Sequence, residues 1–324
     1  MKAIQWLMES DAYVQYATRL HILKQDKREL KQLKSDVLAD PRIQKHLSDI
    51  ADFHGLSITN HKNAELPIHK LIFLMETGLD AEVEQIDMAL GKILSMKGED
   101  GIYKSLTNIP THFGGTGKDA FSWCLCDAPL LLYALLRGGL SYEEHVQAGA
   151  DYIAGLIRDN GFPCAASREL GKFRGPGKQE DCCPYATLQV LKLFSLIPAY
   201  KNAEIARIAG MALLDLWENS WEKHPFLFKM GTDFRKLKVP TIWYDIVSVT
   251  DCLSHYDWAI EDERYKQMIG IIANKANAEM QFTPESIYLK FKEWDFGQKK
   301  QPSPWLTYVC LRILHQSHYI DCVL

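Results

Sequence analysis

Apolar residues follow the spacing of amphipathic helices from the start of the chain. Residues 3–34 predict two helices with polar faces, because Trp6, Val14 and Leu20 fall on one apolar stripe. Pro41 predicts the start of a further helix that ends near Gly55, since glycine commonly stops a helix. The alternation typical of β-strands is scarce. We therefore predict an all-α protein.

From about residue 64 the chain repeats itself. Strongly apolar helices are predicted to begin at residues 65, 126, 183, 244 and 303, which are 61, 57, 61 and 59 residues apart. This period accommodates two helices and their loops. The helices between them, such as residues 142–158 and 202–217, are more amphipathic. This alternation is typical of the inner and outer layers of a helical barrel. We predict an α/α toroid of about five to six helical hairpins at 61–324, with 1–60 as an N-terminal helical segment packed on it.

Composition narrows the class of protein. The 324 residues are 47% hydrophobic and 24% charged, which is typical of a soluble globular protein. The net charge of -4 does not favour a nucleic-acid partner. No apolar run approaches the roughly 20 residues that span a bilayer, and the first residues lack the apolar block of a signal peptide. We predict a cytoplasmic protein whose eight cysteines are free thiols or metal ligands, with its oligomeric state left open.

One Gly- and Pro-rich loop, residues 173–187, carries an acid and two thiols to the start of a predicted helix. Pro184 suits the first position of that helix, where a missing N–H is not needed. Backbone donors at the helix start, with basic side chains beside them, favour an anion site. Asp181 and Cys183 in the same turn would supply half of a metal site.

The loops that precede the inner helices of a toroid lie on a common face. Basic, thiol and aromatic side chains gather in these loops. This end of the barrel would suit a ligand whose anionic head group binds the basic side chains and whose apolar part lies within an aromatic cavity. The candidate substrate-binding residues are Arg174, Lys178, Arg235, Lys238, Trp123, Trp243 and Trp305.

The same loops supply the candidate catalytic and metal-binding residues. The structural alternatives are that the carboxylates favour helix starts and that the thiols pack as small apolar groups. Cys126 occupies the repeat position equivalent to Cys183, and Cys124 is a further thiol that this site can recruit. The candidate catalytic residues are Asp127, Asp181 and Asp245. The candidate metal ligands are Asp181, Cys183, Asp245, Cys126 and Cys164.

The segment from Arg174 to Thr187 resembles the β-subunit of protein prenyltransferases, in which a basic loop runs into an Asp-x-Cys motif that opens an inner helix of an α/α toroid. The resemblance implies that Asp181 and Cys183 bind zinc and that Lys178 binds an isoprenoid diphosphate. The family's third zinc ligand is a histidine, where this chain has Asp245, and a carboxylate also ligates zinc. The toroid repeat, over roughly residues 60–315, is similar to that of terpenoid and triterpene cyclases.

The leading hypothesis is therefore a prenyltransferase- or terpenoid-cyclase-like protein that acts on or binds an isoprenoid diphosphate or a similar anionic amphiphile, with zinc as the expected cofactor. One alternative is a non-catalytic toroid that binds an anionic small molecule or an acidic peptide. A further alternative is a toroidal carbohydrate-active enzyme, which needs paired carboxylates about 5–9.5 Å apart.

Overall fold

The computed structural model describes residues 2–173 and 177–320, so the predicted substrate-binding residue Arg174 lies outside the described residues. The chain is 51% helix and only 4% strand. The prediction of an all-α protein is confirmed.

The chain divides into two compact units, each of which is described by itself. Unit 1 comprises Met1–Leu47, Glu76–Leu79 and Thr232–Leu324. Unit 2 comprises Ser48–Met75 and Asp80–Gly231. The toroidal closure and the predicted boundary at residue 60 stay predictions.

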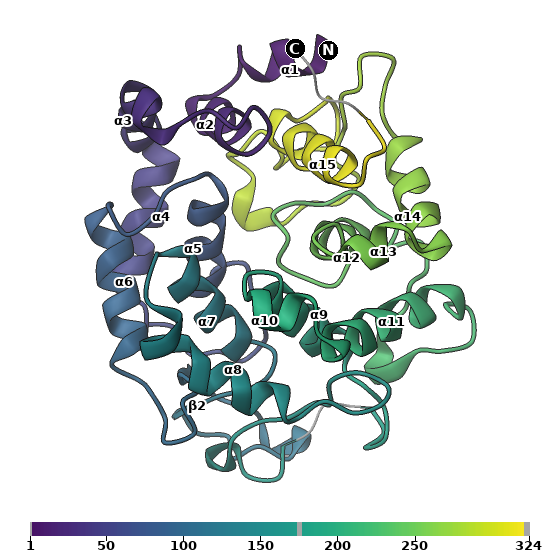
Figure 1. Ribbon diagram of the computed structural model, residues 1–324. Coiled ribbons are helices and arrows are strands. Elements are labelled where there is room, and N and C mark those ends of the chain that lie inside the picture. The colour runs from purple at the N-terminus through teal and green to yellow at the C-terminus, as the bar shows by residue number, and fades with distance from the viewer. Residues whose placement is uncertain (1, 174–176, 321–324) are drawn as a thin grey trace. The chain divides into compact units, whose positions relative to one another are not determined.

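The five strongly apolar helices of the repeat are all present (Figure 1). Each begins one or two residues after its predicted start. Proline opens three of them, which suits a position whose N–H has no helical partner. Every residue of α12 is buried, and in α9 only Lys192 is not. These helices are α5 (Pro67–Glu76), α7 (Ala128–Arg137), α9 (Pro184–Phe194), α12 (Ile246–Leu253) and α15 (Pro304–Gln316).

The helices between them bury only one face, as their amphipathic pattern predicts. In α11, for example, Ala209 and Leu213 are buried while Arg207 is exposed. Within unit 2, α9 packs against both α7 and α11 (Figure 1), and within unit 1, α12 packs against α14 and α15. The intervening helices are α6 (Glu84–Leu94), α8 (Gln147–Ala154), α11 (Glu204–Glu218) and α14 (Glu263–Ala273), with the short α10 (Pro198–Lys201) and α13 (Asp257–Ile260) beside them.

The N-terminal region is more broken than its apolar stripe predicts. Residues 3–34 contain two helices, a 3-10 turn and the start of a third helix, because Lys24 takes a left-handed conformation with φ 54° after the second helix ends. The helix predicted to start at Pro41 is present. These elements are α1 (Lys2–Leu7), α2 (Ala12–His21), the turn Lys27–Leu30, α3 (Lys31–Ala39) and α4 (Pro41–Ala51).

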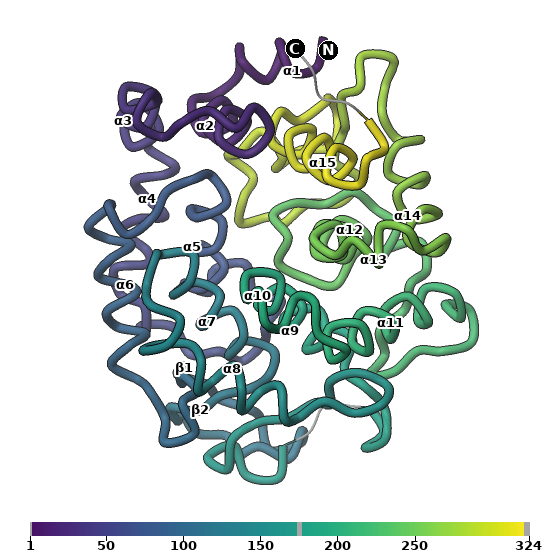
Figure 2. The backbone as a smooth tube through the Cα atoms, in the orientation of Figure 1, coloured from purple at the N-terminus to yellow at the C-terminus, as the bar shows by residue number. Residues whose placement is uncertain are grey.

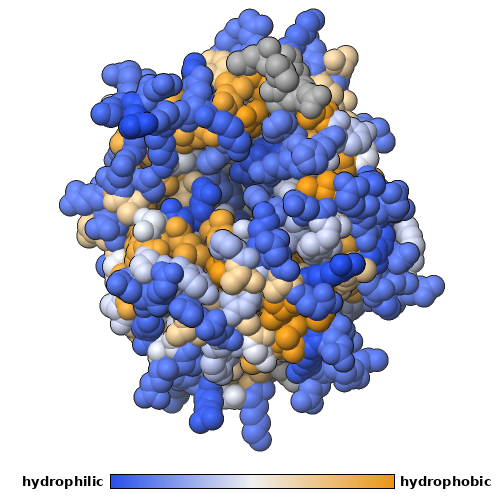
Figure 3. Space-filling model, in the orientation of Figure 1, coloured by the Kyte–Doolittle hydropathy of each residue, from blue (hydrophilic) through white to orange (hydrophobic). Residues whose placement is uncertain are grey.

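Two short strands precede α7 in unit 2. Strands β1 (Ser105–Thr107) and β2 (Ala120–Ser122) pair antiparallel and lie side by side in Figure 2. Strand β2 leads directly into the cysteine-rich segment before α7. Hydrophilic side chains cover much of the face in Figure 3. Within the described residues, no helix is both long enough and apolar enough to cross a bilayer.

Candidate metal centre

Two extended segments of unit 2 pair beside the start of α7. The backbone N–H of Leu125 donates to the carbonyl of Ala165 at 3.0 Å, and the N–H of Ser167 donates to the carbonyl of Trp123 at 2.8 Å. Cys124 and Ala166 form an antiparallel bridge. The pairing ends at Leu125, because residues 125–127 form a turn into α7 in which the N–H of Ala128 donates to the carbonyl of Cys124 at 2.9 Å.

A third segment adds the thiol of Cys183. This residue is the N-cap of α9, and its backbone N–H donates to the carbonyl of Phe162 at 2.7 Å. The thiol of Cys126 donates a hydrogen bond to the sulfur of Cys183. The predicted metal ligands Cys126, Cys164 and Cys183 therefore lie on neighbouring segments of one unit.

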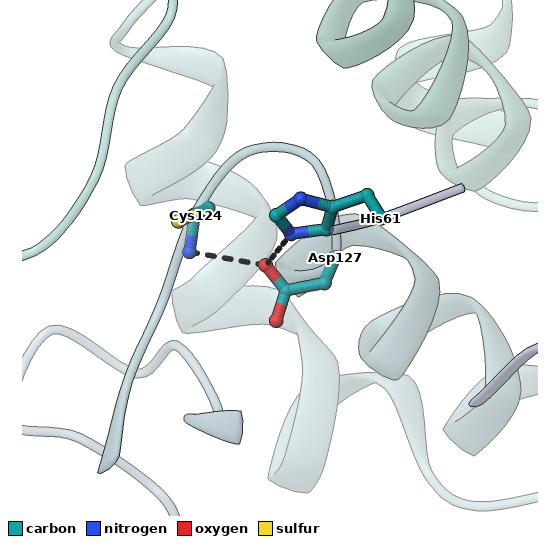
Figure 4. Close-up of side chains that lie close together, drawn as sticks. All are labelled: His61, Cys124 and Asp127. Carbon is teal, nitrogen blue, oxygen red and sulfur yellow. Dashed lines mark hydrogen bonds and ion pairs between the residues drawn. The ribbon is translucent and has the colours of Figure 1, made fainter. Parts of the chain in front are cut away.

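The tightest group of potential metal ligands consists of His61, Cys124 and Asp127 (Figure 4). A ring nitrogen, the sulfur and a carboxylate oxygen lie within 4.8 Å of one another. Asp127 precedes α7, and its Oδ1 accepts from the backbone N–H of Cys124 at 3.2 Å and lies 3.4 Å from Nε2 of His61. Its Oδ2 is buried and has no hydrogen-bond partner among the described residues. Buried carboxylate oxygens are rarely left unpaired, so a missing positive partner is indicated.

Helix α5 holds His61 in place. The Nε2–H of His69, on the first turn of α5, donates to the backbone carbonyl of His61 at 2.8 Å. Burial lowers the pKa of His69 to about 4, so its ring is neutral at physiological pH and keeps one N–H for this bond. The side chain of His61 is 13% exposed, whereas that of Asp127 is 2% exposed. Solvent therefore reaches the centre from the histidine side.

The thiols influence one another's protonation. Burial raises the pKa of Cys124 well above its ordinary range, and the neighbouring Asp127, Cys164 and Cys183 raise it further. The hydrogen bond to Cys183 and burial raise the pKa of Cys126. The pKa of Cys183 is lowered, because that hydrogen bond and nearby backbone N–H groups of α9 outweigh its burial. A bound cation would relieve the repulsion among these acidic groups.

A thiolate, a carboxylate and an imidazole together can hold a divalent metal ion. The resemblance to prenyltransferases implies the same three donor types, yet the donors gathered in this structure stand at other positions. Sequence reasoning missed His61 altogether and gave Cys124 only a secondary place. The available signal was that His61, like the cysteines, lies in a loop before a strongly apolar helix.

The other predicted residues of the loop before α9 lie outside this three-donor group. The N–H of Asp181 donates to the carbonyl of Lys178 at 3.2 Å in a tight turn. The side chain of Asp181 is half-buried and that of Lys178 is exposed. The predicted zinc pair of Asp181 and Cys183 thus stays a prediction.

Asp245, Lys238 and Arg235 belong to unit 1. The Oδ1 of Asp245 accepts from the backbone N–H of Ser248 at 2.9 Å, so the side chain caps α12. Burial raises the pKa of Asp245 to about 7, although hydrogen bonds from the helix and the charge of Lys238 oppose the shift. The Nζ of Lys238 lies 3.4 Å from the centre of the Tyr288 ring. Arg235 is half-buried, which lowers its pKa.

Two of the three predicted tryptophans make core contacts. The Nε1–H of Trp123 donates to Asp100 at 2.7 Å, within unit 2. Trp305 is fully buried in unit 1, with its ring centre 4.9 Å from that of Tyr308. Trp243 is half-buried. These contacts give Trp123 and Trp305 a structural role. A role in substrate binding for any of the three tryptophans stays a prediction.

No protein-family model matches the chain, and no curated protein matches it either.

Proposed function

We propose that this chain is a zinc-dependent, prenyltransferase-like protein that binds an isoprenoid diphosphate or a similar anionic amphiphile, with the zinc held by His61, Cys124 and Asp127. The observation that carries the proposal is the buried, unpartnered Oδ2 of Asp127 beside a thiol and an imidazole. Neither α7 nor its neighbours in the described chain supply a hydrogen bond to this oxygen.

The donor set suits zinc in type and in charge. Zinc binds sulfur, nitrogen and oxygen ligands, and three protein ligands leave a fourth position open, as in catalytic zinc sites. One thiolate and one carboxylate balance the two positive charges of the ion, so the complete centre would be neutral. Neutrality matters because Cys124 and Asp127 are both buried. Bound zinc would supply Lewis acidity and stabilise a thiolate or hydroxide near neutral pH.

The protein groups around the centre orient the proposed ligands and hold a proton on a neighbouring thiol. The N–H of Cys124 holds Oδ1 of Asp127, which fixes the carboxylate plane and leaves Oδ2 free. The ring N–H of His69 positions His61 by donating to the backbone carbonyl of His61. The Sγ of Cys126 keeps its proton and donates it in the hydrogen bond to Cys183.

An anionic ligand is proposed because the loop that leads to α9 carries exposed lysines. Lys172 and Lys178 are exposed in unit 2; Lys178 lies in the segment that resembles the diphosphate-binding loop, and Lys172 lies just before that segment. The ammonium groups of such exposed lysines can bind a phosphate as point charges. A reducing cytoplasm would keep the neighbouring thiols free to bind metal.

The decisive experiment is elemental analysis of full-length protein purified without affinity metals. We expect zinc in the parent and a loss of one zinc per chain in both Asp127→Asn and His61→Ala. Asp245→Asn is the matched control, because it removes a buried carboxylate from unit 1 and should leave the zinc content unchanged. Absence of zinc from the parent, even after incubation with zinc and dialysis, would refute the proposal.

Ligand binding is tested on the zinc-loaded protein. Farnesyl diphosphate should raise the melting temperature, and the shift should shrink in Lys178→Ala and with added salt, since charge attraction is screened. Farnesol and inorganic diphosphate separate the contributions of the two ends of the ligand. If none of the three changes the melting temperature, the isoprenoid part of the proposal fails, whatever the zinc content.

A second candidate function, acid catalysis as in a carbohydrate-active enzyme, is favoured by one observation. The pKa of Asp245 is raised to about 7, which suits a general acid near neutral pH. Aryl glycosides provide the test. Release of phenol by the parent but not by Asp245→Asn would support this function, and an inactive parent would remove it.

A further inference from the structure

We propose an oxyanion site in unit 2, formed by the side chains of Tyr133, Arg137, Gln189 and Lys192, which takes a phosphate or diphosphate group. These residues stand in the second halves of α7 and α9, whereas the candidate metal centre lies before the start of α7. The inference goes beyond the proposed function, because it requires neither zinc nor an isoprenoid chain.

The first observation is a buried amide within α9. Gln189 is only 3% exposed, yet its side-chain amide makes no hydrogen bond to any residue that the structure describes. Buried polar side chains nearly always have a hydrogen-bond partner, and an unpaired one costs folding free energy. A partner from outside the chain is therefore indicated at Gln189.

Lys192 extends the polar face of α9 toward α7. Residues three apart on a helix are neighbours on its surface, so Gln189 and Lys192 share one face of α9. The Nζ of Lys192 lies 5.1 Å from the centre of the Tyr133 ring. Because α7 and α9 pack together (Figure 1), this contact joins the polar face of α9 to Tyr133.

Tyr133 and Arg137 supply the polar groups of α7. They are four residues apart and so share one face of that helix. Tyr133 is 8% exposed, and its hydroxyl makes no hydrogen bond within residues 2–173 and 177–320. The Nη2 of Arg137 donates to the backbone carbonyl of Met75 at 3.0 Å, and no carboxylate in the described chain pairs with this half-buried guanidinium. Its other N–H groups remain available to a ligand.

Helix ends alone do not explain this set of residues. A basic side chain in the last turn of a helix is favoured by the helix dipole, which accounts for Arg137 and Lys192 separately. The dipole gives no reason for Gln189 and Tyr133, whose polar groups lie further inside their helices. Those two residues carry the inference.

The four side chains together match a phosphate group. A guanidinium, an ammonium, a phenol hydroxyl and an amide all donate hydrogen bonds, and phosphate oxygens accept them. Lys192 follows Pro184 by eight residues, which is roughly 12 Å along α9. The site is therefore distinct from Lys178, which lies in the loop before that helix.

Isothermal titration calorimetry of the full-length protein with inorganic diphosphate tests the inference. We expect binding in the parent and in Asp127→Asn, because the site does not use the metal. Gln189→Leu and Arg137→Gln should each weaken binding by about 10-fold or more, since each removes a hydrogen bond to a charged group. Arg207→Gln is the matched control. It removes the same charge from the exposed face of α11 and should change the Kd less than about twofold, because a distant exposed charge is screened.

Thermal unfolding without ligand separates a binding role from a structural one. Gln189→Leu replaces an unpartnered polar group by an apolar group of similar size, so the variant should melt no lower than the parent. A second titration with farnesyl diphosphate identifies the source of the anion. Tighter binding than that of inorganic diphosphate assigns the site to a lipid ester, and weaker binding assigns it to the free anion.

Two results would overturn the inference directly. They are an absence of diphosphate binding in the parent, and an unchanged affinity in Gln189→Leu or in Arg137→Gln. Tyr133→Phe, which removes only the hydroxyl, supplies a further variant if Gln189→Leu does not fold.

Failure of this site is distinguishable from failure of the proposed function. Loss of diphosphate binding in Lys178→Ala together with its retention in Gln189→Leu would assign the anion to the loop before α9. That result would remove the site described here and keep the proposed function. Zinc content, measured on the same samples, shows separately whether the candidate metal centre fails.

Discussion

The starts of α7 and α12 place the same residue type at the same position of the repeat and use it differently. Asp245 accepts a hydrogen bond from the N–H of Ser248, inside its own helix. Asp127 makes no such bond to α7 in the described chain. Its Oδ1 instead turns back to the N–H of Cys124 and toward His61, and its Oδ2 stays unpartnered.

The difference between the two aspartates comes from their neighbours. Around Asp127 the facing segments supply an imidazole and a thiol, so a cation would complete the group. Around Asp245 the neighbours include Lys238, and burial keeps a proton on the carboxyl group up to about pH 7. A carboxylate at a helix start is thus available to a cation only where its own helix makes no cap hydrogen bond to it and other segments supply further donors.

Substitution of the candidate zinc ligands should give the largest difference in zinc affinity between the Asp127 and Asp245 variants. Asp127→Asn and Cys124→Ser should weaken zinc binding by more than about 100-fold, since loss of an outer-shell partner alone typically costs 10–100-fold. Asp245→Asn should change it less than about twofold. Competition with a chromophoric chelator measures these affinities. An equal loss in Asp127→Asn and Asp245→Asn would remove the distinction drawn between the two helix starts.

The pH dependence of stability should identify Asp245. Its pKa rises from an ordinary 3.8 to about 7 in the folded protein, so between these values the folded state binds a proton that the unfolded state does not. Folding stability from this group is therefore complete below about pH 4 and is lost as the pH rises toward 7. The steepest slope is about 1.4 kcal/mol per pH unit.

Urea unfolding of the parent and Asp245→Asn at a series of pH values measures this contribution. The asparagine keeps the cap but cannot ionise, so the parent should lose stability relative to the variant as the pH rises. Parallel curves for the two proteins would show that the carboxyl group ionises normally.

The orientation of His61 should depend on His69. His69→Leu removes the N–H that bonds to the carbonyl of His61, and we expect about a 10-fold loss of zinc affinity, as for other outer-shell partners. His69→Gln, which retains an N–H donor, should recover part of the loss. Zinc affinity that is unchanged in His69→Leu would mean that the loop holds His61 without this bond.

The smallest effect is expected from capping. Asp245→Ala should lower the free energy of unfolding by about 1 kcal/mol relative to Asp245→Asn, because only the latter keeps an N-cap acceptor. Denaturant unfolding of the two variants measures this difference. Equal free energies of unfolding for Asp245→Ala and Asp245→Asn would show that residue 245 does not cap α12.

Periodicity predicted the helices well because helix burial is a local, repeated property. All five strongly apolar helices occur where they were predicted, and α11 shows the expected single buried face. The N-terminal helices were predicted less well. The left-handed turn at Lys24 carries no glycine or proline to mark it, so the apolar stripe gave no sign of the break.

The sequence indicated some of the segments that meet in this region. Spacing within the repeat related Cys126 to Cys183, and Cys164 lies in the same set of loops; the backbone hydrogen bonds place the three on neighbouring segments. The signal for His61, its place in a loop before a strongly apolar helix, was weaker, because a single histidine in a polar loop is common. Only its contact with Asp127, 66 residues away, singles it out.

The sequence by itself determined that this chain is helical, where its apolar helices begin, and that thiols and carboxylates stand before them. These properties depend on the spacing of residue types along the chain, which the sequence gives directly. Tertiary structure decided which donors meet. Three contacts join segments that are separate in the sequence. They are the antiparallel bridge between Cys124 and Ala166, the hydrogen bond from Cys183 at the start of α9 to Phe162, and the hydrogen bond from His69 to His61. A ligand cluster needs atoms within a few ångströms of one another, and only the folded backbone sets that distance.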